Sequence, residues 1–257
     1  VYTQWDEHSM HTEVAKADMV VAIGGDGAML KVARICAQHA IPVLGVNMGW
    51  LGFLTEVKNM NEWESGLDRL FTGDYWIEQR MMINASVIEK GTTIKSVDAL
   101  NDVVISGNVF GRMIQIDAFI DKNWATTYNA DALIISTPTG STAYALATGG
   151  PILPPELRNI LLVPVAPHLS MDRPIVLSEG AVVDIQPAME NRSQIVVTVD
   201  GNVVTELGAN QHICIKSGEH VSQFVRLRDR NYFYRSLLDR MEPRVNRHGP
   251  RRKTFEK

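Results

Sequence analysis

Asp26 stands inside a glycine-rich turn, IGGDGAML, that follows the short apolar run Met19 to Ile23 and precedes residues with helical spacing. The adjacent Gly24 and Gly25 allow backbone torsions that are closed to other residues, and the free N–H groups of a helix start attract anions. A phosphate group is therefore the expected ligand of this turn. A carboxylate here would repel phosphate unless it binds a metal ion or takes part in a proton transfer. We therefore interpret Asp26 as a functional residue. The alternative is a helix-capping Asp in a tight turn.

The spacing excludes two commoner phosphate loops. The turn has neither the lysine of G-x-x-x-x-G-K-[ST] nor the G-x-G-x-x-G dinucleotide fingerprint.

A second polar turn lies within Asp131 to Gly150, DALIISTPTGSTAYALATGG. The pattern predicts a strand over Leu133 to Ser136, a turn over Thr137 to Gly140 and a helix over Ser141 to Ala147. Hydroxyls, helix-start N–H groups and the ring of Tyr144 suit the ribose, phosphate and base of a nucleotide. The alternative is that two chain segments cross closely here and need small side chains for packing. Packing alone, however, does not require so many hydroxyl groups.

A third element, Asn101-Asp102, interrupts the apolar run VDALNDVVIS. An Asn amide both donates and accepts, which suits the edge of adenine, and an Asp accepts from ribose hydroxyls. Alone, such a pair usually marks a bulge or a strand end.

The elements that must position these residues change in type along the chain. The first part predicts a strand–helix–strand unit with a parallel pair, whose ligands lie at the carboxyl ends of the strands. Asn47, Met48 and Gly49 would then lie beside Asp26. The expected segments are helix Ser9 to Lys16, strand Met19 to Ile23, helix Ala28 to His39, strand Ile41 to Asn47 and helix Met60 to Phe71.

In the last of these helices, four apolar residues share one side and are expected in the core, namely Trp63, Leu67, Leu70 and Phe71. Phe53 follows a Gly-rich loop and could stack on a flat ring, or be a core residue instead.

From about Arg80, apolar residues alternate with polar ones, as is typical of β-strands, and turns separate the strands. Examples are Ile114 to Asp121 and Ile195 to Val199. The fold class is therefore α/β plus all-β, with an antiparallel sandwich or barrel. Near the end, helical spacing returns and predicts a last helix that docks on an earlier element. The expected division is an α/β domain over 1–79, a β-sandwich domain over 80–230, and a returning helix with a basic, solvated tail over 231–257.

Composition excludes several classes. The chain has 257 residues, 45% of them hydrophobic, and a net charge of -4, which gives no sign of nucleic-acid or membrane partners. Its longest apolar stretch, Ile160 to Leu177, is broken by prolines and charges. Cys36 and Cys214 lie far apart in the sequence, each among apolar residues. This pattern predicts reduced thiols in a cytoplasmic protein. The chain starts at Val1 and looks cut at the front.

Taken together, GGDG at Gly24 to Gly27, GVNMGWLGFL at Gly45 to Leu54, the Asn101-Asp102 pair and TPTGSTAY at Thr137 to Tyr144 resemble the NAD kinase family. GGDG alone is shared with diacylglycerol and sphingosine kinases. Together with TPTGSTAY and GGPIL, the match is specific and covers most of the chain from Ala17 to about Met241.

The resemblance implies an amino-terminal Rossmann-like α/β domain, a carboxyl-terminal β-sandwich domain, and ATP-dependent phosphorylation of the 2'-hydroxyl on the adenosine ribose of NAD, giving NADP. It implies Mg²⁺ or another divalent metal, NAD and ATP as partners, and a homodimer or homotetramer. The metal ligands are left unknown, as is the choice between proton transfer and metal ligation for Asp26.

The resemblance also assigns site residues. Asp26 corresponds to the catalytic carboxylate, and Gly24, Gly25 and Gly27 to the phosphate and ATP turn. Phe53 is expected near the adenine end, Asn129 near the nicotinamide end and Asp200 near the subunit boundary. The NAD contacts implied are Asp26, Gly27, Phe53, Asn101, Asp102, Asn129, Asp131, Thr139, Thr142, Ala143, Tyr144 and Asp200. Departures from the family pattern include Ala28 for Thr or Asn, Asp102 for Glu, and Asn129, where many relatives have Arg.

Two alternatives stay open at this point. A lipid kinase of the diacylglycerol or sphingosine type usually follows GGDG with a proline and G-T-x-N-D, which this chain lacks. A non-catalytic nucleotide-binding regulator would have little use for Asp26.

Overall fold

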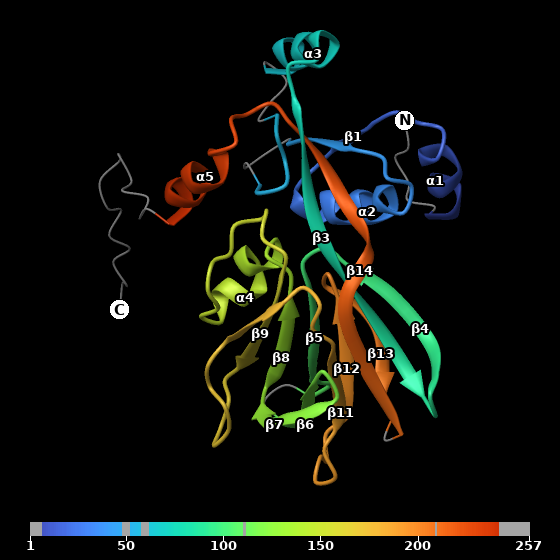
Figure 1. The fold of residues 1–257 in the computed structure, drawn as a ribbon, viewed down its shortest axis with the longest axis vertical. Coiled ribbons are helices and arrows are strands. Elements are labelled where there is room, and N and C mark those ends of the chain that lie inside the picture. Colours follow the sequence, from blue (N-terminus) through green and yellow to red (C-terminus); the bar gives the residue numbers. More distant parts are fainter. Residues whose placement is uncertain (1–6, 48–51, 58–61, 110–111, 209, 242–257) are drawn as a thin grey trace, which may run out of the picture.

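The structure is a computed structural model that describes residues 7–47, 52–57, 62–109, 112–208 and 210–241. Two β-sheets make up the lower part of the molecule in Figure 1, and most of the helices lie toward its upper end. The helices are α1 (Glu7–Val14), α2 (Asp26–Ala37), α3 (Trp63–Thr72), α4 (Tyr144–Ala147) and α5 (Tyr232–Met241), with a 3-10 turn, η2, at Gly140–Thr142.

The first sheet has eight strands and runs from the amino-terminal unit into the sandwich. β1 (Val20–Ile23) and β2 (Val43–Val46) are parallel, as a strand–helix–strand unit requires. β14 (Gln211–Arg226) meets β2 at one end and also pairs with β3 (Trp76–Glu89) and β11 (Val183–Pro187). The other strands of this sheet are β4 (Thr92–Ala99), β6 (Ile114–Ile120) and β7 (Asn123–Ala130).

The second sheet is antiparallel, in the order β10-β9-β8-β5-β12-β13. Its strands are β5 (Asp102–Gly107), β8 (Ala132–Ser136), β9 (Asn159–Val165), β10 (Ile175–Ser178), β12 (Ile195–Val199) and β13 (Asn202–Leu207). Side chains alternate between faces, so Val103 and Ile105 of β5 enter the core between the sheets. Asp102, Val104 and Ser106 then point to the opposite face.

The expected fold class is confirmed, with an α/β part and a two-sheet antiparallel part. The core between the sheets is aliphatic and includes Ile83, Ile116, Leu133 and Ile213, while a separate core packs α2 on β1 and β2. The last helix docks as expected, because Tyr232 is buried against β3 and β14. The boundary expected between residues 79 and 80 falls inside β3, and the division into domains stays a prediction.

Two local predictions differ from the structure. Phe71 was expected in the core with its helix neighbours, but its side chain is 86% exposed at the carboxyl end of α3, whereas Trp63 and Leu70 pack inward. The helix expected over Ser141 to Ala147 is split into η2 and α4, because the backbone at Ala143, with φ -102° and ψ -124°, leaves the helical region.

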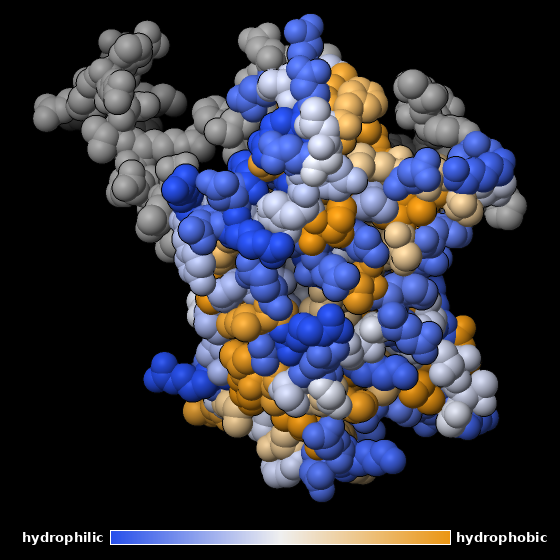
Figure 2. Space-filling view, turned by 45° about the horizontal axis from the view of Figure 1, so that its top comes forward, coloured by the Kyte–Doolittle hydropathy of each residue, from blue (hydrophilic) through white to orange (hydrophobic). Residues whose placement is uncertain are grey.

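Hydrophobic side chains reach the surface in separate groups among hydrophilic ones on the face drawn in Figure 2. Such scattered exposure is ordinary for a folded chain. Among the described residues, no helix has the length and apolar character needed to cross a bilayer.

Candidate functional site

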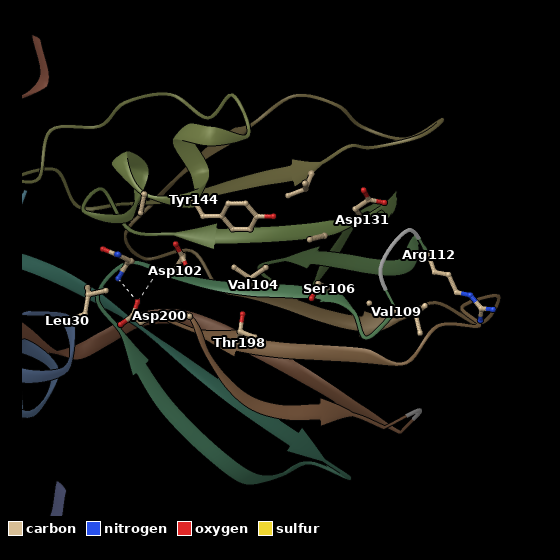
Figure 3. A pocket seen from close by; sticks show the side chains of 16 residues that line it. Leu30, Asp102, Val104, Ser106, Val109, Arg112, Asp131, Tyr144, Thr198 and Asp200 are labelled. Atoms are coloured by element: carbon tan, nitrogen blue, oxygen red, sulfur yellow. Dashed lines mark hydrogen bonds between the residues drawn. The ribbon is translucent and has the colours of Figure 1, made fainter. Parts of the chain in front are cut away.

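A cavity of about 860 Å³ opens on the outward face of the second sheet, where β5 presents Val104 and Ser106. Its walls come from β5, β8 and β12, from α4, and from Leu30 of α2 (Figure 3). The volume lies within the range of small-molecule sites. Six residues predicted from the sequence line it, namely Asn101, Asp102, Asp131, Ala143, Tyr144 and Asp200.

Asp200 fixes the third predicted element. Its carboxylate accepts backbone hydrogen bonds from Leu100 at 2.9 Å, Asn101 at 2.8 Å and Asp102 at 3.1 Å. The Asp200 backbone has a left-handed φ of 46° and donates to the Asp102 carbonyl. The turn between β12 and β13 therefore orients the Asn101-Asp102 pair toward the cavity. The sequence pattern could not predict this role of Asp200, because the hydrogen bonds join segments about a hundred residues apart.

One end of the cavity carries the buried carboxyl of Asp102 and the partly buried carboxyl of Asp200, while Asp131 and Arg112 stand at the other end (Figure 3). Burial, and then repulsion from Asp200, raises the pKa of Asp102 to about 7. Burial also raises the pKa of Asp200, although its three backbone hydrogen bonds oppose that shift. Asp102 can therefore exist as a neutral acid close to neutral pH, and can donate to or accept from a sugar hydroxyl.

The turn after β8 uses its hydroxyls within the protein. Thr137 Oγ1 donates to the Leu100 carbonyl at 2.5 Å, and Ser141 Oγ donates to the Pro138 carbonyl at 2.7 Å while accepting from the Leu153 amide. The argument that a packing site has no use for these hydroxyls is thus wrong for Thr137 and Ser141. Thr137 holds the turn against the Leu100–Asn101 segment and Ser141 ties it to Leu153, while Ala143 and Tyr144 face the cavity.

Thr139 and Thr142 do not line this cavity in the described chain. Thr139 is buried and accepts from Arg80 Nη1 at 3.4 Å, and Thr142 Oγ1 donates to the Thr139 carbonyl. Their contact with a ligand stays a prediction.

The glycine turn leads into α2 as predicted, and its three glycines differ in what they require. Gly24 is confined, since a β-carbon there would lie 2.9 Å from that of Ala28. Gly25 has φ -88° and ψ -178°, torsions open to any residue, so the expectation of a special torsion is wrong for this position. Gly25 and Gly27 have open space where a side chain would stand, which suits close approach of a ligand.

Asp26 is the first residue of α2, and its carboxylate is held by the loop that follows β2. Oδ2 accepts from the Phe53 amide at 2.9 Å and Oδ1 accepts from the Leu54 amide at 3.2 Å. Gly52 is required beside it, because a β-carbon there would lie 1.6 Å from Asp26 Oδ1. The GFL run therefore orients the carboxylate, a role that the sequence argument missed. Met48 and Gly49 lie outside the described residues.

A smaller cavity of about 380 Å³ adjoins the first and shares Leu30 and Asp200 with it. Gly27 also lines it, and α2 adds two cations that sequence reasoning missed, Lys31 and Arg34. Their spacing of three places them on one helix face, a signal that was available beside the glycine turn. This pocket thus joins the end of the glycine turn to positive charge.

Phe53 and Asn129 stand apart from the main cavity. The Phe53 ring lies 6.3 Å from that of Phe233 on α5, centroid to centroid. The Asn129 amide donates to the His168 carbonyl at 3.2 Å, and Asn129 is not among the cavity-lining residues of the described chain. Their roles toward a ligand stay predictions.

The fold and the site together define a nucleotide-binding protein with a glycine turn and an acidic residue at a helix start. Two family models match the sequence: the ATP-NAD kinase N-terminal domain over residues 1–75 and the ATP-NAD kinase C-terminal domain over residues 100–227. The chain belongs to the NAD kinase family.

Curated relatives agree with this assignment. The chain is 41% identical to an NAD kinase of Thermoanaerobacter sp. (strain X514) over 219 residues, which are 85% of this chain and 77% of the relative. It is 40% identical to an NAD kinase of Heliobacterium modesticaldum over 233 residues, 91% of this chain and 81% of the relative.

Solved structures share the fold. Yeast NADH kinase, crystallised with NADH, superposes with a TM-score of 0.79 at 24% identity, covering 93% of this chain and 69% of that one. The Archaeoglobus fulgidus NAD kinase, in complex with ATP, gives 0.71 at 23% identity, covering 88% of this chain and 83% of that one.

Proposed function

We propose that this protein transfers the γ-phosphoryl group of ATP to the 2'-hydroxyl of the adenosine ribose of NAD, forming NADP. The observation that carries the proposal is that the two cavities lie next to each other beside the Asp26 turn, with Asp200 and Leu30 in both walls. Family membership gives no support to the lipid-kinase and regulator alternatives, because the two family models describe both halves of the chain.

The residues divide the work between binding and chemistry. Asn101, Asp102 and Tyr144 line the main cavity and offer an amide, a carboxyl and an aromatic face to a nucleoside. Lys31 and Arg34 supply the positive charge that the phosphates of the substrates require. Asp26 then orients the acceptor hydroxyl and takes its proton late, or holds a metal ion, because phosphoryl transfer depends mainly on positioning and charge neutralisation.

A divalent metal fits this site as a companion of ATP. No cluster of three or more His, Cys, Asp or Glu occurs among the described residues, and Mg²⁺ commonly uses one or two carboxylates together with substrate phosphates. Asp26 is the residue that would hold it, and the ion would neutralise charge on the transferred phosphoryl group.

The proposed activity is tested by incubating the protein with ATP, Mg²⁺ and NAD, and by measuring NADP with a dehydrogenase that reads only NADP. Formation of NADP that requires ATP supports the proposal, and its absence in a folded preparation that binds NAD overturns it. Replacing ATP by polyphosphate in a parallel reaction identifies the donor.

We further propose self-association into a dimer or tetramer, and a cytoplasmic location in which both free thiols, Cys36 and Cys214, stay reduced. Sedimentation velocity tests the assembly.

A further inference from the structure

Arg226 is a fully buried cation at the end of β14, beneath the loop that holds Asp26. Its Nε donates to Glu78 Oε2 at 2.8 Å, and Nη1 lies 3.2 Å from Glu56 Oε2. The guanidinium carbon also lies 5.2 Å from the ring centroid of Phe224 and 4.8 Å from that of Tyr232. The side chain is thus fixed on several sides.

The same guanidinium reaches the backbone of the Asp26 loop. Nη1 donates to the Leu54 carbonyl at 3.2 Å, and Nη2 donates to the Phe53 carbonyl at 3.5 Å. The peptide group between Phe53 and Leu54 therefore accepts from Arg226 through its oxygen and donates to Asp26 Oδ1 through its nitrogen. One trans peptide separates the buried cation from the proposed catalytic carboxylate, and hydrogen bonds in series polarise one another.

Two carboxylates in this cluster, Glu78 and Glu56, stay ionised beside its three arginines, Arg80, Arg226 and Arg228. Burial alone would raise the pKa of Glu78, but Arg80 and Arg226 outweigh it and lower that pKa to about 2. Burial likewise opposes the charge of Glu56, and Arg226 with Arg228 keeps its pKa below the usual value. Both carboxylates are therefore ionised at neutral pH and hold the guanidinium in place.

We propose that Arg226 is a positioning residue for the phosphoryl transfer, acting through the Phe53–Leu54 peptide on the orientation of Asp26. The proposal rests on the proposed NAD kinase activity. It assigns a task in the reaction to a side chain that touches neither cavity, and it explains why a fully buried arginine faces backbone carbonyls as well as carboxylates. Lysine cannot replace it, because one ammonium nitrogen cannot span Glu78 and two carbonyls.

The matched pair of variants is Arg226→Lys and Arg228→Lys. Arg228 also binds Glu56 and the same loop, but through the Thr55 carbonyl at 3.0 Å, which is two peptides beyond the Phe53–Leu54 peptide that binds Asp26. We expect Arg226→Lys to lower kcat by about 10- to 100-fold with the KM values for NAD and ATP within about 3-fold, and Arg228→Lys to keep kcat within about 3-fold.

Two readouts separate positioning from general damage. In an Asp26→Asn background, Arg226→Lys should add little to the loss of kcat, because residues that act through one group are not additive. Hydrogen exchange at the Phe53 and Leu54 amides, followed by NMR, should quicken in Arg226→Lys more than in Arg228→Lys, whether or not the enzyme is active.

Unchanged kcat, a fully additive loss in the Asp26→Asn background, or unchanged exchange at both amides overturns the proposal. If the wild-type protein forms no NADP, the proposed function fails and amide exchange alone decides the positioning role. If Arg226→Lys does not fold, Glu78→Gln is measured in the same assays, because it removes the charge that fixes the Nε edge of the guanidinium.

Discussion

Gly140 lies against the carbonyl oxygen of Asn101 so closely that a β-carbon at position 140 would stand 2.2 Å from that oxygen. The contact joins two motifs about forty residues apart in the sequence, the TPTGST turn and the Asn101-Asp102 pair. The same Asn101 carbonyl accepts from the Thr137 amide at 2.9 Å and from Ser136 Oγ at 3.1 Å. The two motifs therefore form one rigid unit behind the cavity.

Gly140→Ala should destabilise the protein by roughly 1–3 kcal/mol, because the added methyl must displace backbone in a packed core. It should also raise the KM for NAD, since Asn101 and Tyr144 would shift apart. Chemical denaturation and steady-state kinetics measure the two effects. Gly180→Ala is the control, because no atom lies within 4 Å of a β-carbon there. Equal stabilities of the two variants would show that the contact relaxes without cost.

Asp26→Asn should lower kcat by about 10²-fold or more while NAD still binds. The amide keeps the shape of the carboxylate, but it lacks the charge and places an NH₂ group opposite the Phe53 or Leu54 amide. Kinetics with calorimetric NAD binding tests this, and Asp18→Asn, at an exposed position, serves as the control. A kcat within a few-fold of wild type would remove Asp26 from the chemistry.

Asp102 predicts a pH dependence of stability. Its native pKa of about 7 lies above the ~3.9 of an unfolded Asp, so between these values the native state binds more protons. Its contribution to stability is therefore present below pH ~4, is lost as the pH rises to about 7, and is level above that.

Asp102→Asn should remove this contribution. The difference in unfolding free energy between wild type and variant should change by roughly 2–4 kcal/mol across the window, in favour of the variant at high pH. Urea denaturation from pH 4.5 to 8.5 measures it, with the exposed Asp68→Asn as control. Parallel curves for wild type and Asp102→Asn would mean that Asp102 is ionised throughout.

Tyr232→Phe should cost about 1–3 kcal/mol of stability. The hydroxyl donates to Glu78 Oε1 and accepts from Arg80 Nη2, both at 2.7 Å, so its removal leaves buried charged groups short of a partner. Tyr234→Phe, whose side chain is 56% exposed, should be near neutral. Thermal unfolding measures the stability of the two variants side by side. A Tyr232→Phe variant as stable as the wild type would show that Glu78 and Arg80 find other hydrogen-bond partners.

Much of the fold could be predicted because the signals for strands, helices and turns lie within short stretches of sequence. Apolar runs and their periods located β1, α2, β12 and α5 to within a few residues, and the glycine turn fell between a strand and a helix as expected. The prediction for Phe71 failed because the helical period groups it with Leu67 and Leu70, whereas in the last turn of α3 Leu70 packs against the core and Phe71 is exposed.

The motif residues Asn101, Asp102, Ala143 and Tyr144 line the cavity, and their contact with a ligand stays a prediction. The sequence did not indicate which polar side chains serve the backbone of a distant segment. Asp200 binds the amides of residues 100–102, and Thr137 binds the Leu100 carbonyl. Nothing in the local sequence distinguishes such a hydroxyl or carboxylate from one that awaits a ligand.

β14 restricts how this enzyme can move. Its 16 residues are hydrogen-bonded to β3 along most of their length, to β11 at one end and to β2 at the other. A hinge rotation that swings the α/β part away from the sandwich would break backbone hydrogen bonds inside a continuous sheet, so opening and closing of the kind seen in many kinases is disfavoured. Admission and release of substrates then fall to the loops and turns around the cavities, and not to rotation of one half against the other.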